Sequence, residues 1–384
     1  MLKAKEMSIR ILFIAIAMTV SAVQADGHEC YRVQSVSSII RTPFEKPADG
    51  VLADKIDVIA TPGEHEPASI VLFSKEDLSE VMLTSGDLVS ESASIDASHV
   101  DVRIVKCWYQ AGTAWRGLRI QPSIRILVPE LLLKDDSLVK VDYEKRINYV
   151  RLDFEEGSRY VDMSRVNPQK QPGMLNSQFP VKDSATLKPF KLPAEHYKQI
   201  WFTFYVPRNT PAGLYKGLVK ITSSEKLIGQ LEVNLRVLPF RLADSGTYYD
   251  PDEPFVSSIY YKGILCTEKN LQKAGLRGWW KTEQQYRADL KNMLAHGVTN
   301  PHICQFEVDS SLETFAKILK MRQEIGMDNS TIYVHKQSNW GIGTNTDPKI
   351  LQKAIDEIKQ AKKVAENFGV KQLYIYAIDE AKGD

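Results

Sequence analysis

The sequence predicts a multidomain chain of the β plus α/β class: an N-terminal β-sandwich followed by the first half of a (β/α)8 barrel. Short runs that alternate apolar with polar residues dominate residues 26–243, which is typical of antiparallel strands with one buried face. A linker rich in Gly, Ser, Asp and Pro follows at 244–254. Over 255–384 strand-like and helix-like runs then alternate, and this alternation indicates parallel strands.

The first 25 residues have the pattern of a secretory signal peptide. Lys3, Lys5 and Arg10 precede an apolar run at 11–18, and small residues suited to cleavage follow at 21–25. The apolar run is too short to span a bilayer comfortably. We therefore expect an exported protein, periplasmic or extracellular, without membrane insertion.

The composition is that of an ordinary globular protein, with 43% hydrophobic residues, 25% charged residues and a net charge of +1. Without a basic excess, a nucleic-acid partner is not expected. The seven histidines show no metal-binding spacing and the four cysteines form no Cys-x-x-Cys pair, so the sequence implies no metal and no cofactor. It does not indicate an oligomeric state.

Six runs in the first part are expected to be strands of the sandwich. They are residues 55–60, 68–73, 100–109, 199–206, 214–221 and 231–238. Pro207, Pro211 and Gly213 mark a turn between two of them. The interval 155–195 contains two glycines and five prolines, and it is expected to be a long loop or an excursion from the sandwich.

In the second part, strands are expected at 255–261, 298–304 and 331–335, with a fourth in the run that starts at Leu373; helices are expected at 283–295, 312–325 and 347–368. Apolar residues three and four positions apart along the last helix predict one buried stripe. Glycines just after each helix, at 297, 326 and 369, predict C-terminal caps.

Two adjacent carboxylates, Asp379 and Glu380, come where the fourth strand ends. In (β/α)8 barrels the chemistry is found at the carboxyl ends of the strands. Adjacent strand residues point to opposite faces, so both acids can serve one pocket only where the strand finishes. The pair is therefore the candidate catalytic site, and the alternative is a solvated acidic strand end.

Four further residues stand at the same predicted edge. Tyr260 and Tyr261 end the first strand, Glu307 follows the second, and His335 closes the third. Each is a candidate for substrate binding, with a structural role as the alternative.

The cysteines are Cys30, Cys107, Cys266 and Cys304. Cys266 follows the first strand of the second part and Cys304 ends the second strand, so both should reach the same rim. We expect a disulfide between them, and a pair of free thiols is the alternative.

Four motifs together resemble glycoside hydrolase family 123: residues 64–70, 104–112, 206–217 and 376–380. The resemblance implies a β-sandwich followed by a (β/α)8 barrel, and it places the family's Asp-Glu pair at Asp379 and Glu380. It also implies a β-N-acetylgalactosaminidase that works by substrate assistance. The family's barrel continues beyond four strands, so we expect an incomplete barrel here, inactive as this fragment.

In substrate assistance the 2-acetamido oxygen of the sugar attacks the anomeric carbon. Asp379 would orient the acetamido N–H, and Glu380 would act as general acid and then as base. A neighbouring carboxylate raises the pKa of an acid, which keeps one of the two protonated. Trp340, in the loop after the third strand, would offer its flat face to a sugar ring or anchor the loop.

The prediction is an exo-acting, retaining β-N-acetylhexosaminidase whose partner is an N-acetylhexosamine-containing glycan. The alternative is a non-catalytic carbohydrate-binding or surface-interaction protein in which the sandwich is the working part, because a fold does not fix a function.

Overall fold

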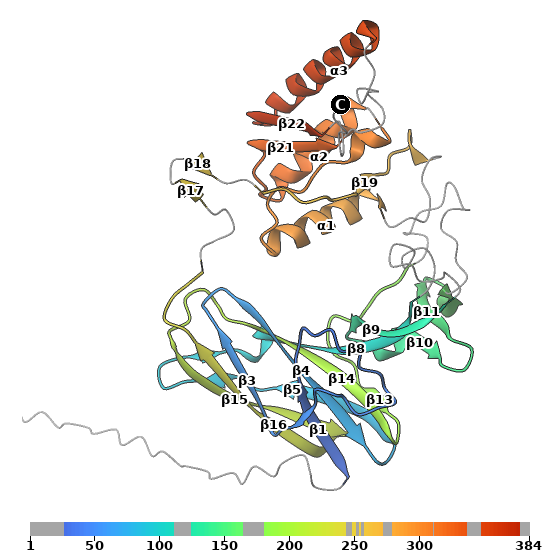
Figure 1. Cartoon of the computed structure of the whole chain (residues 1–384), viewed down its shortest axis with the longest axis vertical. Helices are drawn as coiled ribbons and strands as arrows, with labels where there is room; N and C mark the ends of the chain where they lie inside the picture. The colour runs from blue at the N-terminus through green and yellow to red at the C-terminus, as the bar shows by residue number, and fades with distance from the viewer. Residues whose placement is uncertain are drawn as a thin grey trace, which may run out of the picture. The chain divides into compact units, whose positions relative to one another are not determined.

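The computed structural model describes residues 27–110, 124–163, 180–242, 248–250, 253–254, 257–271, 279–309, 311–335 and 347–376. The chain divides into two compact units (Figure 1). The first unit contains the chain up to Val139 together with Asp183–Arg241, and the second contains Lys140–Lys182 and the chain from Leu242 onward.

Two mainly antiparallel sheets build the first unit. The first sheet has the order β2-β1-β4-β14-β8-β9, with bounds β1 His28–Val33, β2 Val51–Leu52, β4 His65–Ser74, β8 Val100–Gln110, β9 Ile126–Leu133 and β14 His196–Tyr205. The second has the order β13-β5-β15-β16-β3, with β6 beside β15 and β7 beside β6. Its bounds are β3 Lys55–Ala60, β5 Leu78–Ser85, β6 Leu88–Val89, β7 Ser94–Ile95, β13 Phe190–Leu192, β15 Gly213–Ser223 and β16 Lys226–Val237.

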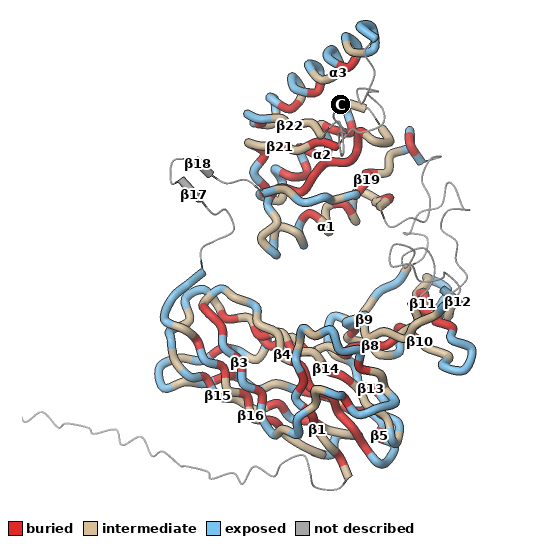
Figure 2. The backbone as a smooth tube through the Cα atoms, viewed as in Figure 1, coloured by how far each residue is buried: buried red, intermediate tan, exposed pale blue. Residues whose placement is uncertain are grey.

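All six strands expected in this part are present, within a few residues of the predicted bounds. The alternation that predicted them is visible in β3, where Ile56, Val58 and Ala60 are buried while Lys55 and Asp57 are exposed. Buried residues of both sheets form one apolar core, and Figure 2 shows buried stretches in red along strands of both sheets. In a sandwich each strand buries only the face that points toward the other sheet.

A third, three-stranded sheet is formed by β10 (Val139–Asp142), β11 (Ile147–Phe154) and β12 (Gly157–Asp162). The expectation of a loop throughout 155–195 is therefore wrong at β12 and β13. β12 pairs with β11 from Phe154–Gly157 to Tyr149–Asp162, and the first proline of the interval comes only at residue 168. The proline-rich composition thus masked a short hairpin that contains no proline.

The second unit has three helices among its described residues: α1 (Glu283–Ala295), α2 (Leu312–Glu324) and α3 (Pro348–Glu366). Side chains of Thr282, Ser311 and Asp347 accept hydrogen bonds at their first turns, which is how exposed helix N–H groups are satisfied. The glycines at 297, 326 and 369 have φ of +79°, +85° and +79°. These left-handed residues after each helix confirm the predicted caps.

The strands of this unit are short. They are β17 (Tyr248–Asp250) with β18 (Glu253–Pro254), β19 (Ile264–Leu265) with β20 (Trp280–Lys281), and β21 (Thr331–His335) with β22 (Gln372–Tyr376). The last two pairs are parallel. The pair β19 and β20 was not predicted.

Four extended segments run in parallel and in chain order. Ile259 bridges Pro301, Ile303 bridges Val334 of β21, and β21 pairs with β22. The strands predicted at 255–261 and 298–304 are reduced to these bridges in the described residues; Pro301 has no N–H to donate. This is the strand order expected for the start of a (β/α)8 barrel, and the barrel itself remains a prediction.

The helices cover one face of these segments through a second core that includes Ile303, Val334 and Phe315. The buried stripe predicted for α3 is only partly right, since Ala354 and Ala361 are buried but Ile355 is 44% exposed. The first half of α3 therefore packs less than its sequence suggests. Within the described residues, no helix is long and apolar enough to cross a membrane.

A buried arginine of the second unit links several of its segments through hydrogen bonds. The guanidinium of Arg322 on α2 is fully buried and donates to Asn329 Oδ1 at 3.0 Å and to the carbonyl of Asp328 at 3.2 Å. It also reaches the carbonyls of Pro301 and Thr299 at 3.5 Å. Burial lowers its pKa to about 10, so it stays charged at neutral pH.

We expect Arg322→Met to destabilise the second unit by about 2–3 kcal/mol, because methionine leaves several buried acceptors without a donor. Arg287→Met on α1 is the control. Arg287 pairs with Glu283 and Glu324 at the surface, and exposed pairs contribute about 0–1 kcal/mol. Denaturant unfolding compares the two variants, and equal effects would contradict the role given to Arg322.

Candidate active site

The face of the parallel segments that lies opposite the helices carries polar and aromatic side chains. Strand residues two positions apart share a face. On this face they are His302, Cys304, Tyr333, His335, Tyr374 and Tyr376. Intervening residues such as Ile303 and Val334 pack in the second core. The face is therefore polar and aromatic where the helix-facing side is aliphatic.

The rings of this face and that of Tyr260 form one connected group, the aromatic-histidine cluster: Tyr260, His302, Tyr333, His335, Tyr374 and Tyr376. His335 stacks on Tyr376 with centroids 5.1 Å apart, and Tyr333 stacks on Tyr374 at 4.9 Å. The ring of Tyr260 meets His302 edge-on at 4.7 Å and Tyr376 at 5.9 Å. These separations are those of favourable aromatic pairs, so the cluster ties all four segments together.

The cluster has a buried part and an open part. His302 and His335 are each only 8% exposed, whereas Tyr260 is 58% and Tyr374 47% exposed. Tyr260 and Tyr374 thus offer accessible ring surface beside buried imidazoles. Aromatic faces of this kind can pack against an apolar ligand surface while a polar group nearby fixes its orientation.

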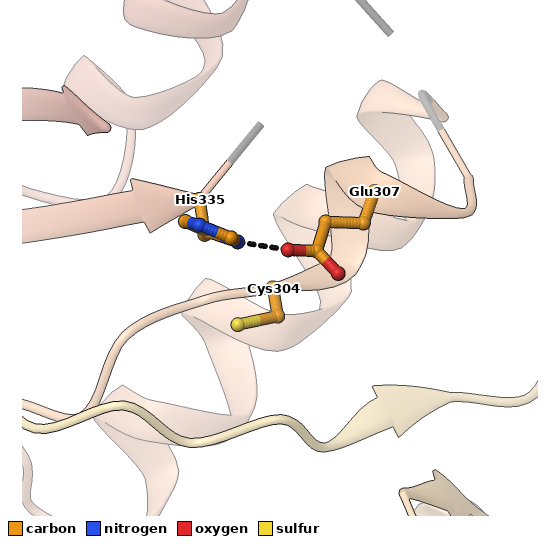
Figure 3. A group of neighbouring side chains, drawn as sticks. All are labelled: Cys304, Glu307 and His335. Atoms are coloured by element: carbon orange, nitrogen blue, oxygen red, sulfur yellow. Dashed lines mark hydrogen bonds and ion pairs between the residues drawn. The ribbon is translucent and has the colours of Figure 1, made fainter. Parts of the chain in front are cut away.

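Two predicted site residues meet at this edge. Glu307 lies in a 3-10 turn, Gln305–Glu307, and its Oε1 makes a hydrogen bond with Nδ1 of His335, the last residue of β21 (Figure 3). A carboxylate only accepts, so Nδ1 carries the proton in this contact. The turn is held in place by the Gln305 side chain, which accepts from Leu265 N–H at 2.8 Å and donates to Leu265 C=O at 3.2 Å.

Burial shifts two polar groups of this face, Cys304 and His302, toward their neutral forms. Burial raises the pKa of the Cys304 thiol to about 11, against a smaller opposing effect of Lys262. Burial also lowers the pKa of His302, and the charge of His335 adds to this. At neutral pH His302 is therefore an uncharged imidazole. Its Nδ1 is buried and has no hydrogen-bond partner within the described parts of the chain.

The structure does not bring Tyr261 to the cluster. Its hydroxyl donates to Asp289 on α1 at 2.9 Å, and its ring meets Tyr286 edge-on at 5.5 Å. Lys281 pairs with the same Asp289 at 2.9 Å. Neighbouring residues in an extended segment point to opposite faces, so Tyr260 and Tyr261 cannot share the role predicted for both.

The remaining predicted site residues, Asp379, Glu380 and Trp340, lie outside the described residues, and their roles stay predictions. In the sequence, Asp379 follows three positions after Tyr376, which belongs to the cluster.

All four cysteines are free thiols. The disulfide expected between Cys266 and Cys304 is therefore not formed, and the alternative of free thiols holds. Cys304 packs with Ile264 and Trp280, and Cys266 lies against the same group. Apolar packing beside Trp280 thus takes the place of the covalent link.

Sequence reasoning missed His302, Tyr333, Tyr374 and Tyr376 as members of this face and considered Cys304 only as half of a disulfide. A signal was present in the spacing, because His302 and Cys304, Tyr333 and His335, and Tyr374 and Tyr376 are each two residues apart. Polar or aromatic residues at every second position of a parallel strand mark a face that is not packed under helices.

Residues 109–223 match the family model described as the glycoside hydrolase 123 N-terminal domain. This match relates the chain to glycoside hydrolase family 123 through its N-terminal part, as the sequence motifs suggested. No curated protein matches the chain significantly.

Among solved structures, a family 123 glycoside hydrolase from Clostridium perfringens, from a study of glycolipid glycan hydrolysis, aligns with 14% identity and a TM-score of 0.43. The alignment covers 73% of this chain and 44% of that enzyme, so the chain spans less than half of the enzyme's length. A xyloglucanase from Bacteroides ovatus aligns at 9% identity and a TM-score of 0.22, over 85% of this chain and 54% of the other.

Proposed function

We propose that this chain carries the catalytic pair of a retaining, exo-acting β-N-acetylhexosaminidase, with N-acetylgalactosaminides as the preferred substrates. The observation that carries the proposal is the aromatic-histidine cluster at the carboxyl ends of the parallel segments, which Asp379 and Glu380 closely follow in the sequence. Family relation through residues 109–223 supports the reaction class. The exported location is part of the same proposal and rests on the first 25 residues.

The cluster supplies what such a reaction needs besides the acids. An accessible tyrosine ring, that of Tyr260, can stack on the apolar face of a sugar. Glu307 and His335 are hydrogen-bonded to each other and can position sugar hydroxyls. Asp379 would orient the acetamido N–H of the substrate, and Glu380 would protonate the leaving oxygen and later activate water.

The binding-module alternative needs a sugar site on the sandwich. A shallow groove of about 550 Å³ lies on the second sheet, lined by residues that include Ser85, Asp87, Lys216, Lys220 and Glu232. None of the described residues that line it is aromatic, so the groove offers no ring for a sugar to stack on. The aromatic-histidine cluster is therefore the better candidate for carbohydrate.

The test compares two aryl β-glycosides that differ only in the 2-substituent, acetamido or hydroxyl, with protein made from the complete open reading frame. Because the acetamide is the nucleophile, we expect hydrolysis of the acetamido glycoside with retained configuration and no detectable hydrolysis of the other. A thiazoline that mimics the cyclised intermediate should inhibit strongly. Equal rates on both glycosides would exclude substrate assistance, and binding without hydrolysis would favour the alternative.

A further inference from the structure

Three side chains of types that can bind a metal lie close together, and one of them, His335, belongs to the aromatic-histidine cluster. One donor atom each from Cys304, Glu307 and His335 lies within 4.8 Å of the other two (Figure 3). Cys304 and His335 are buried and Glu307 is half-buried. The sequence indicated no metal because the donors come from two separate segments, 304–307 and the end of β21.

We propose that Cys304, Glu307 and His335 bind one divalent metal ion of the zinc class. Thiolate, imidazole and carboxylate are the donors that zinc takes in proteins, and three protein ligands leave a fourth position for water or another ligand. Calcium and magnesium prefer all-oxygen surroundings, which this set does not offer. The site is argued without the proposed hydrolase function, and it gives Glu307 and His335 a role as metal ligands in place of the positioning of sugar hydroxyls.

The backbone already holds the donors near each other. Cys304 directly precedes the turn that carries Glu307, whose N–H donates to the Cys304 carbonyl at 3.1 Å. The bridge between Ile303 and Val334 fixes this segment against β21, which ends at His335. Tetrahedral zinc with bonds of about 2.0–2.3 Å places its donors about 3.3–3.8 Å apart. Both Glu307 and His335 would therefore have to give up their mutual hydrogen bond and move apart to coordinate one ion, with Cys304 Sγ already within 4.8 Å of their donor atoms.

His302 is a further unusual group on the same face. It lies two residues before Cys304 on the same face, it is only 8% exposed, and its Nδ1 has no hydrogen-bond partner among the residues described. A buried polar atom without a partner is uncommon in folded proteins.

Cys304 suits a ligand better than a nucleophile. The residue is 1% exposed, so a substrate cannot reach its sulfur, whereas a small ion needs only the three donors around it. Binding through Sγ releases the thiol proton to solvent, because a metal-coordinating thiol is deprotonated, and binding through His335 Nδ1 would also release the proton that this nitrogen shares with Glu307. Metal uptake should therefore release protons and strengthen as pH rises.

The test uses the full chain stripped of metal with a chelator and titrated with zinc by calorimetry, and separately with cobalt(II) by absorption spectroscopy. We expect one ion per chain and, with cobalt, a thiolate-to-metal charge-transfer band together with the visible bands of a tetrahedral site. Zinc uptake below one tenth of an equivalent, or a cobalt spectrum without the thiolate band, would overturn the proposal.

Variants assign the ligands. Cys304→Ala and His335→Gln should each weaken zinc binding by at least about 10–100-fold, the loss known for outer partners of metal ligands, and Cys304→Ala should abolish the thiolate band. Cys266→Ala is the matched control, since Cys266 lies against the same apolar group but outside the three donors. Glu307→Gln, at a half-buried position, serves as the milder variant if a buried substitution prevents folding. Unchanged affinity in folded variants of the three donors would contradict the assignment.

Discussion

We expect Glu380→Gln to lower the turnover of a β-N-acetylgalactosaminide with a poor leaving group by about 100-fold or more, the usual contribution of a positioned general acid. An aryl glycoside with an acidic phenol needs little protonation of its leaving oxygen. On that substrate the variant should recover much of its rate. This difference between the two substrates assigns Glu380 the acid role, which a general loss of folding would not produce.

Asp379→Asn should be slow on both substrates, because it weakens the attack of the acetamido oxygen that either substrate must pass. Removing such an electrostatic stabiliser costs about 100–1,000-fold. The matched control is Glu357→Gln, which changes the glutamate of a second Asp-Glu dipeptide, Asp356-Glu357, on helix α3. Full activity in both Asp379→Asn and Glu380→Gln would remove the pair from the chemistry.

The second large effect concerns stability. Asp136 is a mostly buried carboxylate of the first unit that accepts from Lys106 on β8 at 2.9 Å and from Lys198 on β14 at 2.8 Å. The three side chains are only 15–18% exposed. Burial raises the pKa of Asp136, but Lys198 and Lys106 outweigh it and the pKa is lowered overall. Burial also lowers the pKa of Lys198, against the attraction of Asp136.

Asp136→Asn leaves two buried ammonium groups without a counter-charge. We expect a loss of about 3–5 kcal/mol of unfolding free energy, the cost of breaking a buried ion pair from one side. Asp57→Asn is the matched control, because Asp57 also has two cations, Arg32 at 3.3 Å and Lys55 at 3.7 Å, but at the surface. That control should lose at most about 1 kcal/mol. Urea unfolding measures the unfolding free energy of both variants. Hydrogen exchange at β8 and β14 reports the stability of the strands that carry the two lysines.

The same carboxylate predicts a pH dependence. Its folded pKa lies below its unfolded value of about 3.9, so the unfolded state binds the proton more readily. The stabilisation is then fully present above about pH 4 and is lost as pH falls through the folded pKa. Asp136→Asn should flatten this part of the acid limb, whereas an unchanged acid limb would show that other carboxylates dominate it.

Regular local patterns carried the sequence predictions that the structure confirms. Alternating apolar and polar residues predicted strands such as β3, and the glycines after α1 and α2 predicted where these helices end. These features depend on residues close in sequence, so the chain itself displays them. The hairpin at β12 was missed because composition, rather than local pairing, decided the prediction there.

The Asp379-Glu380 candidate and the order of strands and helices came from the sequence, because a parallel strand displays both its apolar run and its end. Only the tertiary structure decided which side chains meet at that end. It separated Tyr260 from Tyr261, left Cys266 and Cys304 as thiols, and brought Cys304, Glu307 and His335 together. The reason is that parallel strands place residues about 30 positions apart side by side, and the register that does so is set by bridges such as Ile303 to Val334, which no local pattern encodes.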